Sequence, residues 1–372
     1  MKKVLFIATV VRKHINVFHL PFLKMFQEAG YTTYVAAAND TEQSDVVIPY
    51  CDHYVEIDFK RNPLHPGNIK SYTQLKKLID DNDFEIIHCH TPVGGLLGRL
   101  AGIRARKHGT KVLYTAHGFH FYKGAPLKNW LLYYPVEKFC AHFTDVLITI
   151  NNEDYALAKK KMKAKRVEYV PGVGIDISKF ENIQIDRNAK RREIGVPEDA
   201  FVLTSVGEIS KRKNHIAILQ ALTKIDNENI HYVIVGKGSL LDELQSFAKD
   251  HAMENRVHFL GFRSDVAEIY KASDVCCLPS IHEGLPVALM EGMASGLPCI
   301  ASRIRGNTDL IDNSSCLADY CDADGFAKSI KKLIDEPEIR NDISKSNIQR
   351  VKNFKKQIVL EKMMELYNQL SV

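Results

Sequence analysis

The stretch that decides the fold is residues 275–294, which read VCCLPSIHEGLPVALMEGMA. Val275–Pro279 is a short apolar run typical of a buried strand, and a helix is predicted to begin at Pro286, because proline suits the first position of a helix. A strand followed by a short loop and a helix is half of a β–α–β unit. The free backbone N–H groups and the dipole of such a helix start favour an anion such as phosphate.

The same alternation of short apolar runs and amphipathic stretches continues along the chain. In the first half, strands are expected at Val4–Val11, Tyr31–Ala38, Tyr54–Asp58, Glu85–His90, Lys111–His117, Asp145–Ile150 and Val167–Val173. In the second half, they are expected at Phe201–Gly207, Tyr232–Gly236, Val257–Gly261, Asp274–Pro279, Cys299–Ser302 and Cys316–Ala318. Many of these runs are apolar throughout, as parallel strands covered by helices on both faces are. The sequence therefore predicts an α/β protein of two doubly wound, Rossmann-like domains, with ligands at the carboxyl ends of the strands, facing a central cleft.

Composition marks the expected domain boundary and the class of protein. Residues 181–197 are polar and charged without a strand pattern, so we expect a linker there between a domain at 1–180 and a domain at 198–354. Of the 372 residues, 45% are hydrophobic and 26% are charged, as in a soluble globular protein. No apolar run approaches the roughly 18–20 residues that cross a bilayer. Eight cysteines without a Cys-x-x-Cys spacing predict a reduced, cytoplasmic protein, and the amino-terminal apolar run is interpreted as a strand rather than a signal peptide.

Charge is distributed unevenly along the chain. Residues 1–180 carry 25 Lys and Arg against 17 Asp and Glu, whereas the remainder carries 25 against 28. A basic first half indicates an anionic partner, although random surface variation explains the difference equally well. The aromatic segment Trp130–Tyr134, close to Lys123 and Lys128, adds the hypothesis of docking on an anionic membrane surface. The alternative is that Trp130, Leu131 and Tyr134 pack one helix onto the sheet.

Basic residues give no further sign of a nucleic-acid partner. The cluster Lys159–Arg166 is interpreted as a solvated helix end, which also adds positive charge to the first half. No expected strand is followed by G-x-G-x-x-G, which argues against a dinucleotide-dependent dehydrogenase.

Two carboxylates in the opening stretch are candidate ligand-binding groups. Glu283 precedes the predicted helix, and Glu291 lies one turn after Val287, so its side chain leans back over the helix start. Carboxylates beside a phosphate site would repel the phosphate, but they accept strong hydrogen bonds from sugar or ribose hydroxyls. The alternative is that Glu283 caps the helix and Glu291 is solvated.

Glycines and a lysine follow two other expected strands. Gly207 ends a strand and precedes a cationic loop that carries Lys213 to the start of the next helix. Glycine lets a ligand approach the backbone, and lysine is a frequent phosphate partner. Gly236–Gly238 repeats this arrangement of strand, glycine and helix, but a plain tight turn explains these glycines equally well. Considered alone, the cationic loop is also compatible with a solvated surface.

Histidines follow strands of the first half. His117 closes an expected strand in a loop rich in glycine and aromatic residues, whose ring faces suit sugars. His88 and His90 share one face of a strand, where we expect a packed or hydrogen-bonded pair rather than a metal site. Asp81–Asp83 is similar to an Asp-x-Asp metal motif, but it precedes a strand, at the wrong end of a parallel sheet, and is interpreted as a surface turn. We therefore predict no metal site and no cofactor.

Together these residues resemble the family 4 retaining glycosyltransferases of the GT-B fold, over nearly the whole chain. Glu283 and Glu291 match the paired-glutamate E-x7-E motif of that family. Gly207 and Lys213 match its diphosphate loop, and His117 matches its histidine at the donor sugar. Stretches around His90 and His117 look like those of bacterial exopolysaccharide or capsule transferases.

The resemblance implies a nucleotide-diphosphate sugar, UDP-linked, in the second domain and a lipid-diphosphate-linked saccharide acceptor in the first. It also implies a reaction at the inner face of the cell membrane without a catalytic metal, and a final helix at about 355–372 that crosses back onto the first domain. Glu283 would hold the hydroxyls of the sugar ring, Glu291 the ribose, and the turn at Phe262 would frame the base. The implied site residues are His117 and Glu283 as catalytic residues and Gly207, Lys213, Phe262, Gly284, Leu285, Val287 and Glu291 as nucleotide-sugar-binding residues.

Two departures from the family pattern leave alternatives open. Glu208 stands where the family has an arginine, and Arg212, Arg303 and Arg305 are candidate replacements. The loop at Thr9–Arg12 lacks the usual glycine pair. A nucleotide-sugar epimerase of the same fold is the first alternative, and a nucleotide-sugar-binding accessory subunit, suggested by Glu208, is the second.

Overall fold

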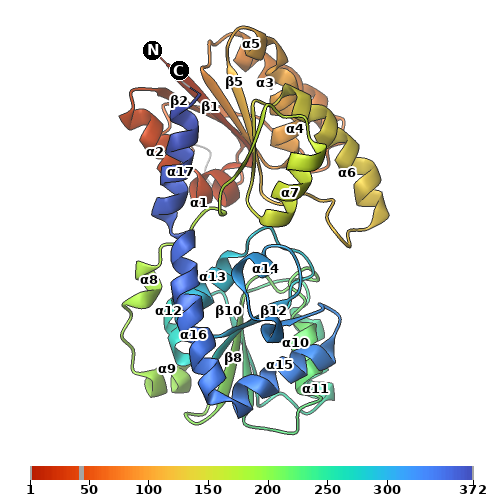
Figure 1. The fold of residues 1–372 in the computed structure, drawn as a ribbon, viewed down its shortest axis with the longest axis vertical. Helices are drawn as coiled ribbons and strands as arrows, with labels where there is room; N and C mark the ends of the chain where they lie inside the picture. Colours follow the sequence, from red (N-terminus) through yellow and green to blue (C-terminus); the bar gives the residue numbers. More distant parts are fainter. Residues whose placement is uncertain (1, 42–45, 371–372) are drawn as a thin grey trace. The chain divides into compact units, whose positions relative to one another are not determined.

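The computed structural model describes residues 2–41 and 46–370, and contacts divide the chain into two compact units. The first unit runs to Val173 and includes the segment from Val359 onward, and the second is Gly174–Ile358 (Figure 1). Each unit is built around one parallel sheet, so the predicted α/β fold class is confirmed.

The sheet of the first unit has the strand order β3-β2-β1-β4-β5-β6-β7. Its strands are β1 (Lys3–Val10), β2 (Thr32–Ala38), β3 (His53–Glu56), β4 (Ile86–His90), β5 (Lys111–Ala116), β6 (Val146–Thr149) and β7 (Arg166–Tyr169). Its helices are η1 (Val11–Ile15), α1 (Asn16–Phe18), α2 (Leu20–Glu28), α3 (Gly67–Asp80), α4 (Pro92–Ala101), α5 (Ile103–Lys107), α6 (Leu127–Cys140), η2 (Ala141–Phe143), α7 (Asn152–Lys161) and α17 (Lys356–Asn368).

Both faces of this sheet are covered, which is why its central strands β1, β4, β5 and β6 are almost fully buried. Leu5 and Ile7 of β1 point into one buried cluster, whereas Val4 and Phe6 point into the other, as the two-residue period of a strand requires. Helix α17 contributes Val359, Met363, Leu366 and Tyr367 to the cluster that contains Phe6. The end of the chain is thus part of the core of the first unit.

The sheet of the second unit has the strand order β10-β9-β8-β11-β12-β13. Its strands are β8 (Phe201–Val206), β9 (Ile230–Val235), β10 (Val257–Gly261), β11 (Val275–Leu278), β12 (Cys299–Ser302) and β13 (Leu317–Ala318). Its helices are α8 (Ser178–Glu181), α9 (Arg187–Glu193), α10 (Ile216–Leu222), α11 (Leu241–Asp250), α12 (Val266–Ala272), α13 (Val287–Ala294), α14 (Asn307–Leu310), η3 (Ser314–Cys316), α15 (Ala323–Asp335), α16 (Pro337–Val351) and η4 (Lys352–Phe354).

The stretch expected as a linker, residues 181–197, is folded onto the second unit. It contains α9, which packs against α12. The buried guanidinium of Arg191 donates to the carbonyl of Ala272 at 2.9 Å and to the carboxylate of Asp274 at 2.8 Å. A charged run looks solvated in sequence, but here backbone carbonyls and one carboxylate satisfy the buried charge.

The strand order reverses beside β1 in the first sheet and beside β8 in the second. In open α/β sheets, ligands bind at the carboxyl ends of the strands next to such a reversal. The relevant loops therefore follow β1, β4 and β5 in the first unit, and β8 and β11 in the second.

Candidate active site

The loops after β8 and β9 approach each other so closely that they require glycine. Gly207 and Gly236 have φ values of 153° and 154°. A Cβ on Gly236 would lie 1.8 Å from the carbonyl oxygen of Gly207, which no side chain tolerates. Gly207 N donates to the carbonyl of Val235 at 2.9 Å. The backbone at the end of β8 is therefore held in place and free of side-chain bulk.

Lys213 and Arg212, in the loop after β8, meet Glu283, in the loop after β11. Nζ of Lys213 and Nη1 of Arg212 each donate to Oε1 of Glu283 at 2.8 Å. Lys213 and Glu283 are 9% and 8% exposed. Asn214, at a φ of 57°, fixes the loop by donating to the carbonyl of Pro279 at 3.0 Å. Two cations thus lie at one carboxylate, and the structure brings Lys213 and Glu283 together.

Glu283 is an ionised carboxylate at neutral pH. Burial acts to raise its pKa, but the charges of Lys213 and Arg212 outweigh burial and lower the pKa below its ordinary value. Among the residues that the structure describes, none caps α13 with its side chain, so the alternative of Glu283 as a helix cap is wrong. Helix α13 begins at Val287, so Pro286 is the residue before the helix and not, as expected, its first residue.

Glu291 lies one turn into α13, and it is not the solvated group of the alternative interpretation. Burial raises the pKa of Glu291 to about 7, against the opposing charge of Lys213. Near neutral pH this carboxyl group therefore exists in both its neutral and its ionised form, and it can donate or accept a hydrogen bond.

The three candidate replacements for the family arginine differ in their partners. Arg303 donates to the carbonyls of Leu317 and Ser314, at 2.8 and 3.2 Å. Nη2 of Arg305 lies 2.6 Å from Nε2 of His282. Arg212 is the arginine that contacts Glu283.

The remaining predicted residues lie on the loops around this cluster. A Cβ on Gly306, whose φ is 78°, would lie 2.4 Å from the carbonyl oxygen of Gly284, so the loop that carries Gly284, Leu285 and Val287 runs against its neighbour. Phe262 follows the edge strand β10, which β9 separates from β8, and its side chain is 77% exposed. The structure therefore groups Gly207, Lys213, Glu283 and Glu291, with Phe262 two strands away.

In the first unit, His117 belongs to a cluster of four histidines. It follows β5, His90 ends β4, His14 lies in the π-helical turn η1 after β1, and His19 precedes α2. One ring nitrogen from each lies within 4.8 Å of the others, and Nε2 of His117 is 3.4 Å from Nδ1 of His90. Sequence reasoning missed His14 and His19. The signal was available, because three of the four rings follow strands that are neighbours in the sheet.

His88 and His90 are packed and hydrogen-bonded as expected, but only His88 has partners for both ring nitrogens. Its Nδ1 is 2.6 Å from the hydroxyl of Tyr367 and its Nε2 is 2.8 Å from the hydroxyl of Thr115. The ring of His90 stacks on Phe6 at a centroid distance of 5.9 Å.

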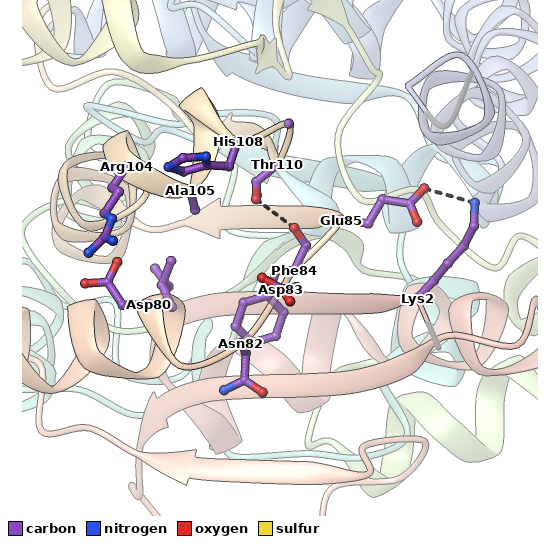
Figure 2. Close-up of a pocket in the computed structure, with 12 residues that line it drawn as sticks. Lys2, Asp80, Asn82, Asp83, Phe84, Glu85, Arg104, Ala105, His108 and Thr110 are labelled. Carbon is purple, nitrogen blue, oxygen red and sulfur yellow. Dashed lines mark hydrogen bonds and ion pairs between the residues drawn. The ribbon is translucent and has the colours of Figure 1, made fainter.

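A hollow of about 710 Å³ lies at the opposite, amino-terminal edge of the first sheet. Figure 2 shows Asp80, Asn82 and Asp83 on one side of it and Arg104 and His108 on another. Asp81–Asp83 forms the turn between α3 and β4, as expected. Because ligands of parallel α/β sheets bind at the carboxyl ends of strands, this hollow is not the candidate active site.

No helix within residues 2–41 and 46–370 is long and apolar enough to cross a membrane.

Two family models cover most of the chain. Residues 3–151 match the model described as glycosyl transferase 4-like, and residues 186–350 match the model described as glycosyl transferases group 1. The boundary between the models falls close to the boundary between the two units.

Whole-chain comparisons agree with these matches. The putative glycosyltransferase EpsD of Bacillus subtilis (strain 168) is 40% identical over 99% of this chain and 96% of that protein. The UDP-Gal:alpha-D-GlcNAc-diphosphoundecaprenol alpha-1,3-galactosyltransferase of Escherichia coli is 33% identical over 77% of this chain and 75% of that protein. The structure of HepE from Anabaena, in complex with UDP and glucose, shares the fold with a TM-score of 0.79 at 18% identity, over 99% of this chain and 100% of that one. The chain therefore belongs to the group 1, family 4-like glycosyltransferases, and it is a glycosyltransferase with the GT-B fold.

Proposed function

We propose that this glycosyltransferase moves a hexose from a UDP-linked donor to a saccharide carried on a lipid diphosphate, with retention of configuration, in the biosynthesis of a cell-surface polysaccharide. The observation that carries the proposal is the contact of Lys213 and Arg212 with Glu283 beside the start of α13. The Escherichia coli relative, by its name, uses UDP-galactose and a diphosphoundecaprenol-linked acceptor, which supports the same chemical classes here.

Departure of the nucleotide diphosphate is the step that needs most stabilisation. Negative charge accumulates on the leaving diphosphate as the bond to the sugar breaks. Lys213, Arg212 and the backbone N–H groups at the start of α13 provide fixed positive charge and donors for it. Gly207 leaves the adjoining backbone open to close approach. These residues would stabilise the leaving group without a bound metal ion.

The carboxylates then position the sugar and the ribose. Glu283, which is ionised, accepts hydrogen bonds from sugar hydroxyls, and Lys213 holds it in place. Glu291 binds the ribose, with Gly284, Leu285 and Val287 lining the loop. Phe262 presents an exposed ring on which a base can stack. His117 is assigned to the donor sugar by the family resemblance alone.

We also propose that the first unit docks on the anionic inner face of the cell membrane through α6. Leu127, Leu131, Leu132 and Phe139 on this helix are between 56% and 72% exposed. Lys128 lies on the same helix, within the basic first half of the chain. Apolar side chains beside lysines fit the interface of an acidic leaflet, where a lipid-linked acceptor would be held.

The test is transfer by the purified protein. A panel of UDP-sugars is incubated with synthetic saccharide–diphosphate–lipid, and the lipid product and UDP are both quantified. A lipid-linked product in step with UDP is expected. Release of UDP without lipid product would favour an epimerase, and binding of the donor without either product would favour an accessory subunit.

A further inference from the structure

The four clustered histidines of the first unit have the composition of a metal site. We propose that His14, His19, His90 and His117 bind a divalent transition metal, for which Zn²⁺ is the best fit. Neutral imidazole suits zinc, copper and nickel, whereas magnesium and calcium prefer oxygen ligands. One nitrogen from each ring lies within 4.8 Å of the other three.

The distances are close to those of a tetrahedral site. Zn–N bonds of about 2.0–2.1 Å place neighbouring nitrogens of a tetrahedron about 3.4 Å apart. Nδ1 of His90 and Nε2 of His117 are 3.4 Å apart. The other pairs, at up to 4.8 Å, have to approach by at most about 1.4 Å, which ring rotation can supply.

Four of the eight ring nitrogens in the cluster have no other partner among the described residues. Nε2 of His14, both nitrogens of His19 and Nε2 of His90 are buried without a hydrogen bond to any residue that the structure describes. Burying a polar atom without a partner costs free energy, so native structures seldom keep several together. The neighbouring His88 is not proposed as a ligand, because its two ring nitrogens are hydrogen-bonded to Tyr367 and Thr115. A metal ion would give a partner to one nitrogen of each ring, including one on His14 and one on His19 that have none here.

Protons do not compete for these rings at neutral pH. Burial lowers the pKa of His14 to about 3 and that of His117 to about 4. Burial, together with the neighbouring histidines, holds the pKa values of His19 and His90 well below the ordinary value. Only neutral imidazole binds a metal, so all four ligands are in the required form.

Two local features support a site rather than accidental packing. His14 lies in η1, a π-helical turn, and such turns occur frequently at functional sites. A cavity of about 20 Å³ borders His19, His90 and His117, which is room for one water-sized ligand beside the rings.

Metal binding has a consequence for the reaction, which rests on the role proposed for His117 above. The nitrogen of His117 that ligates Zn²⁺ cannot also bind the donor sugar, and ligation fixes the orientation of the ring. The metal is then an inhibitor, and not a cofactor, of transfer. This consequence is separate from binding itself, which is measured without substrate.

The experiment uses the full chain without a polyhistidine tag, first freed of metal by a chelator. Titration with Co²⁺ should give the intense visible absorption of a tetrahedral site at one equivalent, and Zn²⁺ should abolish it by displacement. His14→Ala removes a partly exposed ligand and should weaken Zn²⁺ binding by at least tenfold in calorimetry, since even outer partners of a ligand contribute 10–100-fold. His108→Ala, which removes an exposed histidine outside the cluster, should bind as the wild type does.

The outcomes distinguish metal binding at the four histidines from inhibition of transfer by that metal. Absence of stoichiometric binding, or equal affinity in His14→Ala and the wild type, would overturn the metal site. To separate loss of binding from misfolding, melting temperatures are compared. Zn²⁺ should raise the melting temperature of the wild type more than that of His14→Ala, and the two proteins should melt at the same temperature when metal-free. Stoichiometric binding without inhibition would leave the site standing and show that the ligating nitrogen of His117 is not the one that transfer requires.

Discussion

Nζ of Lys213 lies 2.8 Å from Oε1 of Glu283, although 70 residues separate them in sequence. The contact joins the loop after β8 to the loop after β11, two strands that are neighbours in the sheet. The carboxylate holds the ammonium in position, and the charge of the ammonium lowers the pKa of Glu283.

Glu283→Gln and Lys213→Ala should each lower turnover by about 10²–10³-fold, the usual cost of losing one transition-state contact. Initial rates of transfer with saturating donor measure the effect. Lys211→Ala is the matched control, since it removes an exposed cation from the same loop and should change the rate less than twofold. Wild-type rates in both site variants would refute the assignment.

Arg212→Ala should also lower turnover, by about 10-fold or more, because Arg212 is the arginine that shares Glu283 with Lys213. Arg212→Lys keeps the charge but not the planar fork, so only partial recovery is expected. The comparison is made in kcat at saturating donor. If Arg212→Ala is as active as the wild type, the missing family arginine has no replacement in this loop.

Glu291 should make stability depend on pH. Its pKa is about 7 in the folded protein, above the ordinary value of 4.5, so the native state holds a proton that the unfolded state releases. Stability is therefore complete below about pH 4.5 and declines as the pH rises through 7. Glu291→Gln mimics the neutral form, and its stability relative to the wild type should increase by about 1–3 kcal/mol from pH 5 to pH 8. Urea unfolding at both pH values measures this difference, and parallel pH profiles of the two proteins would contradict it.

Transfer should not require a divalent metal. The loops around Lys213 supply the positive charge that a metal would otherwise provide, so dialysis against a chelator should leave the rate within about twofold, far from the 10²-fold cost of a lost contact. Rates are measured before and after dialysis, with magnesium and manganese added back. A loss that either ion restores would refute the prediction, whereas a rise after dialysis would agree with inhibition by metal at the histidine cluster.

The sequence predicted the strands well because short apolar runs between helical stretches are typical of buried parallel strands. Glu283, Lys213 and Gly207 follow the strands β8 and β11, and residues after neighbouring parallel strands lie at one edge of a sheet. At residues 181–197 the charge run containing Arg191 looks solvated in the sequence, whereas in the structure this guanidinium donates to buried backbone carbonyls. The choice among Arg212, Arg303 and Arg305 needed coordinates, since partners distant in sequence decide which arginine points to Glu283.

The histidine cluster shows the same limit. His90 and His117 were visible as strand-end residues, and His14 also follows a neighbouring strand, but the π-helical turn that brings its ring to the cluster is seen only in the structure. Likewise, the residues of the aromatic segment of α6 have different environments in the structure. Trp130 and Tyr134 pack against Phe121, as the packing alternative expected, whereas Leu131 is exposed, contrary to it.

The purified protein should therefore bind to acidic vesicles through the exposed apolar residues of α6. Leu127, Leu131 and Phe139 remain in water in the free protein, and their insertion among lipid tails adds apolar burial to the attraction of basic residues, worth about 1 kcal/mol each near an anionic surface. Binding to vesicles of acidic phospholipid, measured by sedimentation, should weaken steeply with salt, because charges are screened within about 8 Å at physiological ionic strength. Neutral vesicles should bind weakly.

Leu127→Ser with Leu131→Ser should reduce this binding by about tenfold or more, since each loses exposed apolar area without disturbing the core. Leu64→Ser is the matched control, because Leu64 is also exposed, at 81%, but lies outside α6. If the double variant binds as the wild type does, the contact with lipid lies elsewhere on the protein. If the wild type ignores acidic vesicles even at low salt, the first unit does not dock, and the lipid-linked acceptor has to be bound through its saccharide and diphosphate alone.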